Sequence, residues 1–351
     1  MDQRFNTHSI QIDSGLLQAI ATIDEFKGRW HALCKLGPEQ LLGLKHTATI
    51  QSIGASTRIE GVSLSDEAIE ALLKHSDLPP NNRDEQEVKG YAETLALINA
   101  HFDALTLTEG HVLQLHRDLL QFSSGDARHR GAYKTVDNTI AAVGSDGQYL
   151  GTVLKTTSPF DTPSQMADLI DWTHQALDKQ THHPLVVVAV FVVVFLKIHP
   201  FVDGNGRLSR LITHWLLRRA GYEHIAFASL EKVIESSKED YYLALRRTQA
   251  TLLDPKPNWQ PWLNYFLRAL LEQKQKLETI MEREQALNAQ LPPLARALLE
   301  IIEQRGRLSV AEAVVLTGAN RNTIKTHLKR LAQNGQIRRR GAGRGSWYGP
   351  R

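Results

Sequence analysis

The sequence predicts a mainly α-helical protein with one small β-hairpin and a separate, basic C-terminal domain. Apolar residues recur at helical spacing through most of the first 291 residues, and two short β-prone stretches flank a Gly-rich turn. The charge of the chain then changes sign near Pro292. With 351 residues, of which 42% are hydrophobic and 23% charged, the chain has an ordinary globular composition and room for two or three domains.

Composition excludes several classes of protein. The single cysteine, Cys34, excludes an internal disulfide and is typical of a reducing compartment. The polar first eight residues do not resemble a signal peptide. The longest apolar run, Leu185–Leu196, has 12 residues and is too short to span a bilayer. We therefore expect a cytoplasmic protein that does not act in a membrane.

The two parts of the chain differ in charge. Residues 292–351 contain 12 Lys and Arg against 3 Asp and Glu, which gives a net charge of +9. The first 291 residues contain 29 against 35, a net charge of −6, so that the whole chain carries +3. Only the C-terminal part has the charge that favours contact with nucleic acid.

Residues 1–105 form a predicted N-terminal helical region. Up to residue 50 the helical patterns are weak and predict only packing. A helix is predicted over 64–74, with Ser63 and Asp66 as a capping box. Just before it, Glu60 precedes Gly61 at a helix C-terminus, where a carboxylate is slightly unfavourable and needs another partner.

The middle of the chain alternates between helices and a hairpin. The predicted helices span residues 85–101, 108–120 and 163–180. Two predicted strands, 133–140 and 148–154, flank a turn at 144–147 and form the hairpin. The segment 185–196 is ambiguous. Its periodicity and its seven valines favour a buried strand, whereas a helix that is apolar on every side would have to be buried on all sides.

The stretch from Leu196 to Arg210 has the composition of a phosphate-binding site. Gly204 and Gly206 lack a Cβ atom, so that backbone N–H groups can approach an anion closely. A helix that begins near Gly206 adds partial positive charge at the same place. Arg207 and Arg210 lie three residues apart and can bind phosphate oxygens from one helix face.

Two further residues of this stretch suit the chemistry of a polyphosphate. Asp203 is a hard oxygen ligand that can hold Mg²⁺, and His199 can accept a proton near neutral pH. Taken singly, a histidine before a turn is usually structural, and a Gly-Asn-Gly turn is common between helices. Their occurrence together, within a dozen residues of two arginines, predicts a functional site.

The stretch resembles the signature of the Fic family, His-x-Phe-x-Asp/Glu-Gly-Asn-Gly-Arg-x-x-Arg, at every specified position from His199 to Arg210. The resemblance implies a Fic-type all-helical core over residues 106–270, with a helix over 185–196. It implies that the hairpin, residues 133–154, is a flap that pairs with the backbone of a target protein. The implied activity is that of a protein adenylyltransferase, a nucleotidyltransferase that moves AMP from ATP to a Ser, Thr or Tyr hydroxyl.

The resemblance also implies roles for individual residues. His199 would be the catalytic base and Asp203 the Mg²⁺ ligand. The implied phosphate-binding residues are Gly204, Asn205, Gly206, Arg207 and Arg210. Tyr241 and Tyr242, in a helix predicted over 237–248, are candidates to contact the adenine base. The alternative is that these two tyrosines pack in the core, as aromatic residues at helical spacing usually do.

A second motif lies upstream, in a helix predicted at about 50–62. Ser56, Glu60 and Gly61 match the Fic inhibitory motif, Ser/Thr-x-x-x-Glu-Gly/Asn. In that family the glutamate pairs with the second arginine of the signature, here Arg210, and blocks productive placement of the γ-phosphate. The physical basis is that a carboxylate and a phosphate compete for the same guanidinium group.

The C-terminal residues 292–351 form a predicted separate domain, joined to the core by a charged helical connector over 271–291. Ser309 and Asn320 are predicted caps of its second and third helices, and two strands flank the Gly-rich segment 341–345. This pattern resembles a winged helix-turn-helix. The resemblance implies contact with DNA, and the alternative is contact with another protein.

Two functions from different classes follow from the sequence. The first is an autoinhibited protein adenylyltransferase, or a related enzyme that removes AMP or transfers another phosphate-containing group. The second is a DNA-binding transcriptional regulator whose Fic core is repressed or sensory. The sequence identifies neither the target protein nor the DNA site, and it leaves open whether the chain forms a homodimer.

Overall fold

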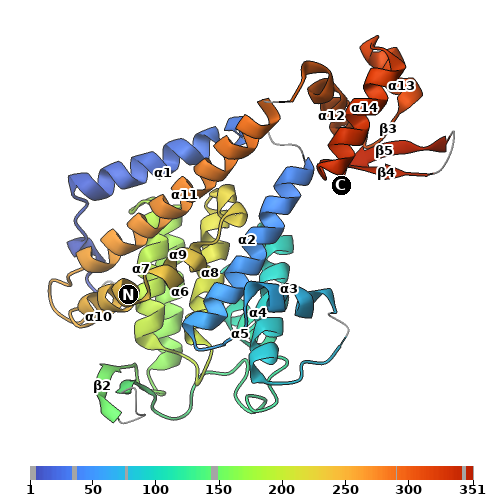
Figure 1. The fold of residues 1–351 in the computed structure, drawn as a ribbon. Helices are drawn as coiled ribbons and strands as arrows, with labels where there is room; N and C mark the ends of the chain where they lie inside the picture. The colour runs from blue at the N-terminus through green and yellow to red at the C-terminus, as the bar shows by residue number, and fades with distance from the viewer. Residues whose placement is uncertain are drawn as a thin grey trace. The chain divides into compact units, whose positions relative to one another are not determined.

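The computed structural model describes residues 5–33, 38–75, 78–143, 149–289, 291–341 and 345–350 (Figure 1). The chain divides into two compact units. The first comprises Met1–Trp30 and Thr47–Lys274, and the second comprises His31–His46 and Gln275–Arg351. Helices predominate, as the sequence predicts. Among the helices of the described ranges, none combines the length and the hydropathy that a membrane span requires.

The first unit is built from helices and one two-stranded hairpin. Three of its helices, α1, α2 and α11, continue into the second unit. The elements are η1 (Thr7–Ser9), α1 (Ser14–Leu33), α2 (Pro38–Ile59), α3 (Asp66–Lys74), α4 (Arg83–His101), α5 (Glu109–Leu119), β1 (Thr139–Val143), β2 (Tyr149–Lys155), α6 (Thr162–Asp178), α7 (Pro184–Ile198), α8 (Asn205–Arg219), η2 (Glu223–Phe227), α9 (Leu230–Ser236), α10 (Lys238–Gln249) and α11 (Gln260–Ala289).

The ambiguous apolar segment is helix α7, at the centre of the first unit. It lies beside α6 and α8 (Figure 1), and every residue from Leu185 to Leu196 is buried. Pro184 occupies the first turn of α7, where its missing N–H is harmless, and the His183 side chain caps the Leu185 N–H. Each valine costs up to ~0.7 kcal/mol in helix propensity. Burial of each valine contributes about 1.5–3 kcal/mol, so that packing outweighs local preference.

Two predicted boundaries are wrong. The cap of α3 is Ser65, whose side chain accepts a hydrogen bond from the Ala68 N–H. Ser63, the predicted cap, instead donates its hydroxyl to Asp84 at 2.8 Å. A contact 21 residues away in the chain therefore replaces the local capping box.

The first flap strand also begins later than predicted, at Thr139 instead of residue 133. Lys134 and Asn138, which precede β1, donate hydrogen bonds to carbonyl groups of residues 198–201. β1 and β2 pair antiparallel, with register shifts between Ile140 and Ala141 and between Ala142 and Val143. The predicted turn at 144–147 lies outside the described residues, as do Cys34 and the tip of the Gly-rich segment near Arg344.

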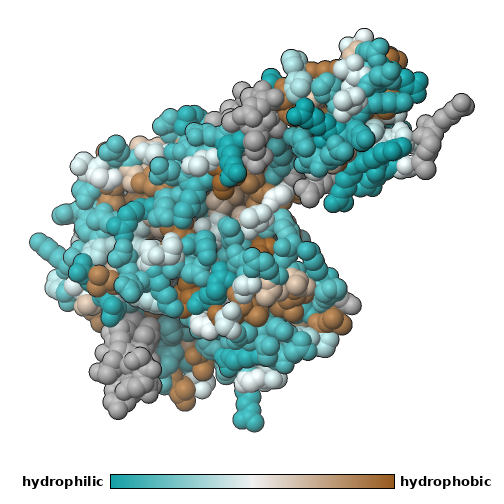
Figure 2. All heavy atoms as spheres, viewed as in Figure 1, coloured by the Kyte–Doolittle hydropathy of each residue, from teal (hydrophilic) through white to brown (hydrophobic). Residues whose placement is uncertain are grey.

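The second unit contains three short helices and a small antiparallel sheet in the order β3-β5-β4. Its elements beyond α11 are α12 (Pro293–Arg305), β3 (Leu308–Ser309), α13 (Val310–Thr317), α14 (Arg321–Gln333), β4 (Ile337–Arg340) and β5 (Trp347–Pro350). Ser309 and Glu312 form a capping box on α13, and Asn320 caps α14, so that both predicted caps are confirmed. The unit has its own apolar core, which includes Leu298, Ile324 and Leu328. Hydrophilic side chains predominate on the face drawn in Figure 2.

Candidate active site

The predicted site is a loop, residues 199–204, between the C-terminus of α7 and the N-terminus of α8. His199 ends α7 in the left-handed conformation, with φ of 51°, and Gly204 precedes α8 with φ of 79°. A left-handed residue other than glycine is strained and persists only where its surroundings fix it. The loop therefore needs contacts that hold its backbone, and the structure supplies them from several elements.

His199 has the properties of a proton acceptor. Burial lowers the pKa of His199 to about 4, because the imidazolium form is poorly solvated there; nearby Lys134 lowers it further, and Glu60 and Asp203 work in the opposite direction. The ring is therefore neutral at pH 7. Its Nδ1 atom is buried and makes no hydrogen bond of good geometry among the described residues, and the Leu196 backbone close to the ring works to raise the pKa.

Arg210 is buried and is held by the end of α2. Its Nε atom donates to the Ser56 hydroxyl at 2.7 Å, and Nη2 donates to the Ser56 carbonyl at 2.8 Å. The same Nη2 atom lies 2.7 Å from Glu60 Oε1. Burial works to lower the pKa of Arg210, but the groups around it, with the Glu60 carboxylate first, together raise it. The structure thus brings Ser56 and Glu60 to Arg210, which lies about 150 residues later in the chain.

The Glu60 carboxylate also lies against the N-terminus of α8. A Cβ atom added to Gly206 would meet Glu60 Oε1 at 2.1 Å, so that only glycine leaves room for it. The N-terminus of a helix attracts an anion through its free N–H groups and its dipole. Gly61 follows with φ of 109°, a conformation that favours glycine and lets the chain turn directly after Glu60. A carboxylate therefore occupies the anion position that the sequence predicts for phosphate.

Arg207 faces a different set of partners. Its Nη1 atom lies 2.6 Å from Glu87 Oε2, and its Nη2 atom donates to Asp203 Oδ2 at 3.1 Å. Arg83, at the start of α4, binds the same Asp203 oxygen at 3.0 Å and Glu87 at 2.8 Å. The two signature arginines, predicted to act as one phosphate fork, thus have separate carboxylate partners, with Arg210 on Glu60.

The side chains of Asp203 and Asn205 form hydrogen bonds with the backbone of the loop and so fix its shape. Asp203 Oδ1 accepts a hydrogen bond from the Gly204 N–H at 2.6 Å. Burial works to raise the pKa of Asp203, but the Arg207 charge and this hydrogen bond lower it. Asn205 uses both of its polar side-chain atoms on Phe201, accepting from its N–H at 3.0 Å and donating to its carbonyl at 2.8 Å. The Asn205 side chain therefore closes the loop.

His116 supports the loop from α5, a role that the sequence does not indicate. Its ring stacks on Phe201 with centroids 3.7 Å apart. Nδ1 accepts from the Gly131 N–H at 2.9 Å, so that Nε2 carries the hydrogen and donates to the Asp203 carbonyl at 3.0 Å. Burial lowers the pKa of His116 to about 4. Arg83, Glu87 and His116 lie among ordinary helical residues, and no local pattern in the sequence marks them.

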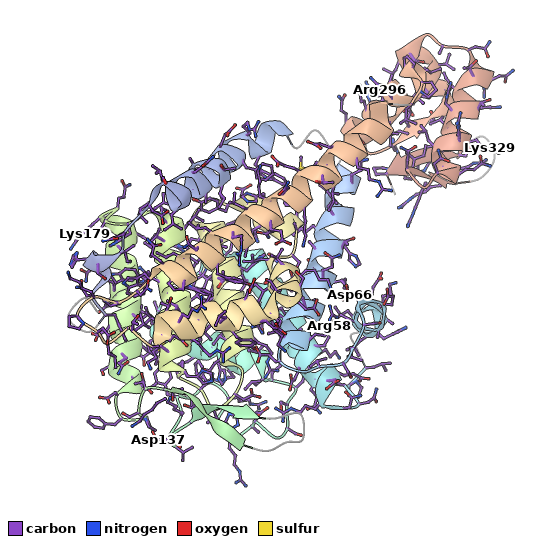
Figure 3. All side chains as sticks on the ribbon, turned by 60° about the vertical axis from the view of Figure 1, so that its left-hand side comes forward. Arg58, Asp66, Asp137, Lys179, Arg296 and Lys329 are labelled. Carbon is purple, nitrogen blue, oxygen red and sulfur yellow. The ribbon has the colours of Figure 1, made fainter. Side chains whose placement is uncertain are left out.

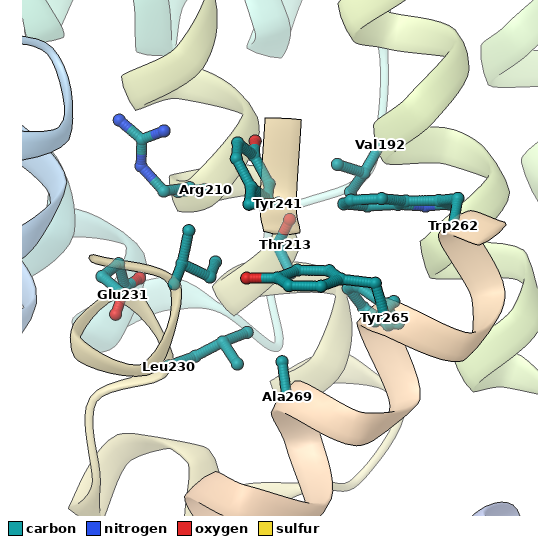
Figure 4. Close-up of a pocket in the computed structure, with 11 residues that line it drawn as sticks. Val192, Arg210, Thr213, Leu230, Glu231, Tyr241, Trp262, Tyr265 and Ala269 are labelled. Atoms are coloured by element: carbon teal, nitrogen blue, oxygen red, sulfur yellow. The ribbon is translucent and has the colours of Figure 1, made fainter. Parts of the chain in front are cut away.

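The two candidate adenine-binding tyrosines differ in exposure. Tyr241 is buried and packs edge-on against Trp262, with ring centroids 5.7 Å apart. It lines a cavity of about 20 Å³, roughly the space of one water molecule, together with Arg210 and the buried Glu231 (Figure 4). Tyr242 is partly exposed and lies near Glu60. Burial raises the pKa of Tyr242, and the Glu60 charge raises it further. Of the two, Tyr242 is the one that a ligand can reach.

A Fic/DOC family profile matches residues 106–217 of the chain. The protein adenylyltransferase Fic of Nematostella vectensis is 25% identical over 201 residues, which cover 56% of this chain and 42% of that protein. The corresponding protein of Drosophila willistoni is 26% identical over 262 residues, covering 71% of this chain and 48% of that protein. The matches therefore span less than half the length of these relatives.

Solved structures share the fold. A Fic family protein from Desulfovibrio desulfuricans superposes with a TM-score of 0.64 at 24% identity, covering 98% of both chains. A Fic domain-containing signalling protein from Bacteroides thetaiotaomicron gives a TM-score of 0.58 at 24% identity, covering 73% of this chain and 97% of that one. Over residues 106–217 the chain is therefore similar to the Fic/DOC family, and it shares the fold of these two Fic proteins.

Proposed function

We propose that this protein is an autoinhibited protein adenylyltransferase, which transfers AMP from ATP to a hydroxyl group of a target protein. The observation that supports the proposal best is the Glu60 carboxylate on Arg210 and against the N-terminus of α8. A site that holds one anion in this way can hold a phosphate group once the carboxylate leaves. The relatives named as protein adenylyltransferases favour the same activity.

The proposed reaction needs one base and a set of phosphate-binding groups. The neutral His199 accepts the proton of the target hydroxyl, whose oxygen attacks the α-phosphorus of ATP. The bond from this phosphorus to the oxygen that bridges it to the β-phosphorus breaks, and pyrophosphate leaves. The N–H groups at the start of α8 and the Arg210 guanidinium bind the phosphates, so that catalysis rests on positioning and charge.

The residues present fit one Mg²⁺ ion bound together with the nucleotide. Among the described residues, no cluster of three or more His, Cys, Asp and Glu side chains could hold a metal ion alone. Asp203 is a partly exposed carboxylate beside the phosphate position, and Mg²⁺ commonly binds one or two carboxylates while phosphate oxygens and water complete its shell. Bound in this way, the ion would neutralise phosphate charge, and Asp203 is the residue that would hold it.

We further propose that Glu60 inhibits the enzyme by holding Arg210. The Glu60 side chain is 31% exposed, so that its own charge can be solvated when it turns away, and a bound phosphate then compensates the buried Arg210. Arg210 then becomes available to the γ-phosphate. The hairpin of β1 and β2 would supply a free strand edge for the backbone of the target.

Labelled ATP tests the activity. The wild type and the Glu60→Gly variant are incubated with ATP labelled on either the α- or the γ-phosphate, and self-modification is followed. We expect more α-label on the variant and no γ-label on either protein. Incorporation of γ-label would contradict AMP transfer and would favour transfer of a phosphoryl group. Mass spectrometry of lysate proteins modified by Glu60→Gly would then identify the targets and the group transferred.

A second activity is proposed for residues 292–351, as a winged helix that binds DNA. Exposed cations on α14 and β4 support this proposal, namely Arg321, Lys325, Lys329, Arg330, Arg338, Arg339 and Arg340. The full-length chain is compared with a Lys325→Glu, Lys329→Glu variant in a titration of duplex DNA at several salt concentrations. We expect weaker binding and a shallower salt dependence in the variant. Identical salt dependence in the two proteins would exclude α14 as the DNA contact.

A further inference from the structure

The backbone of the loop that carries His199 is held by the base of the flap. Four successive carbonyl groups, those of residues 198–201, accept hydrogen bonds from two residues that precede β1. Lys134 Nζ donates to the Ile198 carbonyl at 3.1 Å, and the Lys134 N–H donates to the Pro200 carbonyl at 2.9 Å. Asn138 Nδ2 lies 2.8 Å from the Phe201 carbonyl and 3.5 Å from the His199 carbonyl.

Lys134 also joins the two ends of the flap. Its Nζ atom donates to Asn138 Oδ1 at 2.7 Å, just before β1, and to the Thr156 hydroxyl at 3.0 Å, just after β2. The Thr156 hydroxyl in turn reaches Asn138 Oδ1 at 2.7 Å. Figure 3 labels Asp137 beside the flap at this point. One ammonium group thus connects both ends of the hairpin with the C-terminus of α7.

The burial of Lys134 is costly for a residue that only fills space. The residue is 2% exposed, and its ammonium group donates to neutral oxygens of Asn138, Thr156 and Ile198. Burial lowers the pKa of Lys134 to about 8, although the charge of nearby Asp137 works in the opposite direction. The three N–H groups are fully used by three neutral oxygens, of which Ile198 belongs to the negative end of the α7 dipole. An apolar side chain of similar volume would avoid this desolvation, so that the charge and its three bonds need another explanation.

We propose that Lys134 is a positioning residue that fixes the flap to the His199 loop, so that target hydroxyl and base share one rigid frame. The inference rests on the proposed AMP transfer for its catalytic part. The flap aligns the target, and the loop carries the base. A displacement of about 1 Å between reacting groups can reduce a rate about a hundredfold. A direct connection between the two elements is therefore where the structure controls that distance.

Two variants and a matched control test the proposal in the full-length Glu60→Gly protein. Lys134→Met removes the charge and the three hydrogen bonds at nearly constant volume, and Lys134→Arg keeps the charge. Lys89→Met is the control, because Lys89 is also buried and donates to a backbone carbonyl, that of Leu78, but lies on α4 away from the flap. Self-modification is measured as kcat and KM for ATP.

We expect Lys134→Met to reduce kcat about tenfold to a hundredfold with KM for ATP within about twofold, whereas Lys134→Arg recovers part of the loss. A second readout is the pH profile. Besides Lys134, the charged groups that act on His199 are Glu60, absent in this background, and Asp203. Because the Lys134 charge lowers the pKa of His199, its removal should move the acidic limb of kcat to higher pH. A role in packing alone would not produce this shift.

Hydrogen exchange tests the connection without reference to AMP transfer. Amides of β1 and β2 should exchange at least about tenfold faster in Lys134→Met than in Lys89→Met, with α1 and α6 unchanged. Unchanged flap exchange, or equal kcat in the two methionine variants, would overturn the proposal. If Glu60→Gly transfers no AMP at all, the proposed function fails, whereas the exchange result still decides whether Lys134 holds the flap.

Discussion

The two signature arginines lie three residues apart on α8 but belong to different regions of the first unit. On one side, Arg207 is 2% exposed and pairs with Glu87, which is 11% exposed, near the start of α4. On the other, Arg210 pairs with Glu60, which is 31% exposed and lies just beyond the end of α2. Both are guanidinium–carboxylate pairs of similar length, 2.6 and 2.7 Å.

The comparison teaches that the position of the acid, more than the strength of the pair, decides its role. Glu87 and Arg207 are both nearly inaccessible to water, so that separating them would leave two poorly solvated charges, and Arg83 holds Glu87 as well. Glu60 can turn into water, and a phosphate can take its place. We therefore expect the Arg207 side to behave as structure and the Arg210 side to behave as a switch.

The largest effect is expected on AMP transfer itself, the proposed reaction to which the Arg207 and Arg210 sides both contribute. In the Glu60→Gly background, His199→Ala should reduce AMP transfer about 10²- to 10⁴-fold, because it removes the general base. Binding of ATP, measured by calorimetry, should change little. Residual transfer near the level of the parent would show that another group accepts the proton, and the site would have to be assigned again.

The next prediction compares the stability of the two pairs. Arg207→Ala should lower the free energy of unfolding by about 3–5 kcal/mol, because it removes a buried guanidinium that pairs with both Glu87 and Asp203. Arg210→Ala should cost about 1–3 kcal/mol, since Glu60 can be solvated and mainly the bonds to Ser56 are lost. Urea unfolding followed by tryptophan fluorescence reports on the first unit, which holds five of the six tryptophans. Equal losses would remove the distinction between structure and switch.

Substitution of the two acids should change activity in opposite directions. Glu60→Gly should raise AMP transfer about tenfold to a hundredfold, the equivalent of one hydrogen bond between charged groups. Glu87→Gln, of nearly the same volume as glutamate, should lower it, because Arg207 and Asp203 lose a fixed neighbour. Initial rates of α-label incorporation measure both. A higher rate in both variants would mean that Glu87 also inhibits the enzyme, through Arg207.

The smallest effect concerns the contact that holds the end of α2. Arg58, labelled with Asp66 in Figure 3, lies 2.6 Å from Glu235 and 2.9 Å from Asp66. Glu235→Gln should weaken this contact by about 0.5–1 kcal/mol and raise AMP transfer a few-fold, because Glu60 is then less firmly held. Lys232→Gln, which removes the neighbouring Glu235 partner but not Arg58, is the control and should change the rate less.

The same contact predicts a pH dependence. Burial works to raise the pKa of Glu235, but hydrogen bonds from Arg58 and Lys232 lower it below its usual value. A carboxyl group with a lowered pKa contributes stability above its ordinary pKa and loses it as the pH falls through the lowered one. Unfolding titrations should therefore show an acid-side loss of stability in the wild type that is smaller in Glu235→Gln.

Part of this arrangement could be predicted from the sequence. The motif from His199 to Arg210 is contiguous, and its glycines and charged residues indicate phosphate binding without reference to distant segments. Helix α7 was harder, because seven valines favour a strand and only burial on all sides reverses that preference. The pairing of Glu60 with Arg210 followed from a resemblance, not from any periodicity in the chain.

The rest could not be predicted, because it depends on contacts between distant segments. Glu87 is one acid among several at the start of α4, and only the fold places it on Arg207, 120 residues later. Lys134 lies in a short basic stretch that contains a glycine, a composition typical of a connecting loop, yet it is buried. Ser63 matches a local capping pattern, but its hydroxyl donates a hydrogen bond to Asp84 instead. In each case tertiary partners, absent from any local window, decide the outcome.

Gly206 connects the proposed inhibition with the proposed catalysis. Its missing Cβ makes room for the Glu60 carboxylate, 2.1 Å from where that atom would lie, and the same space would admit a phosphate. A larger residue at this position would displace both the proposed inhibitory carboxylate and a phosphate. We therefore expect substitutions of Glu60 to release the proposed inhibition, whereas substitutions of Gly206 should impair AMP transfer as well.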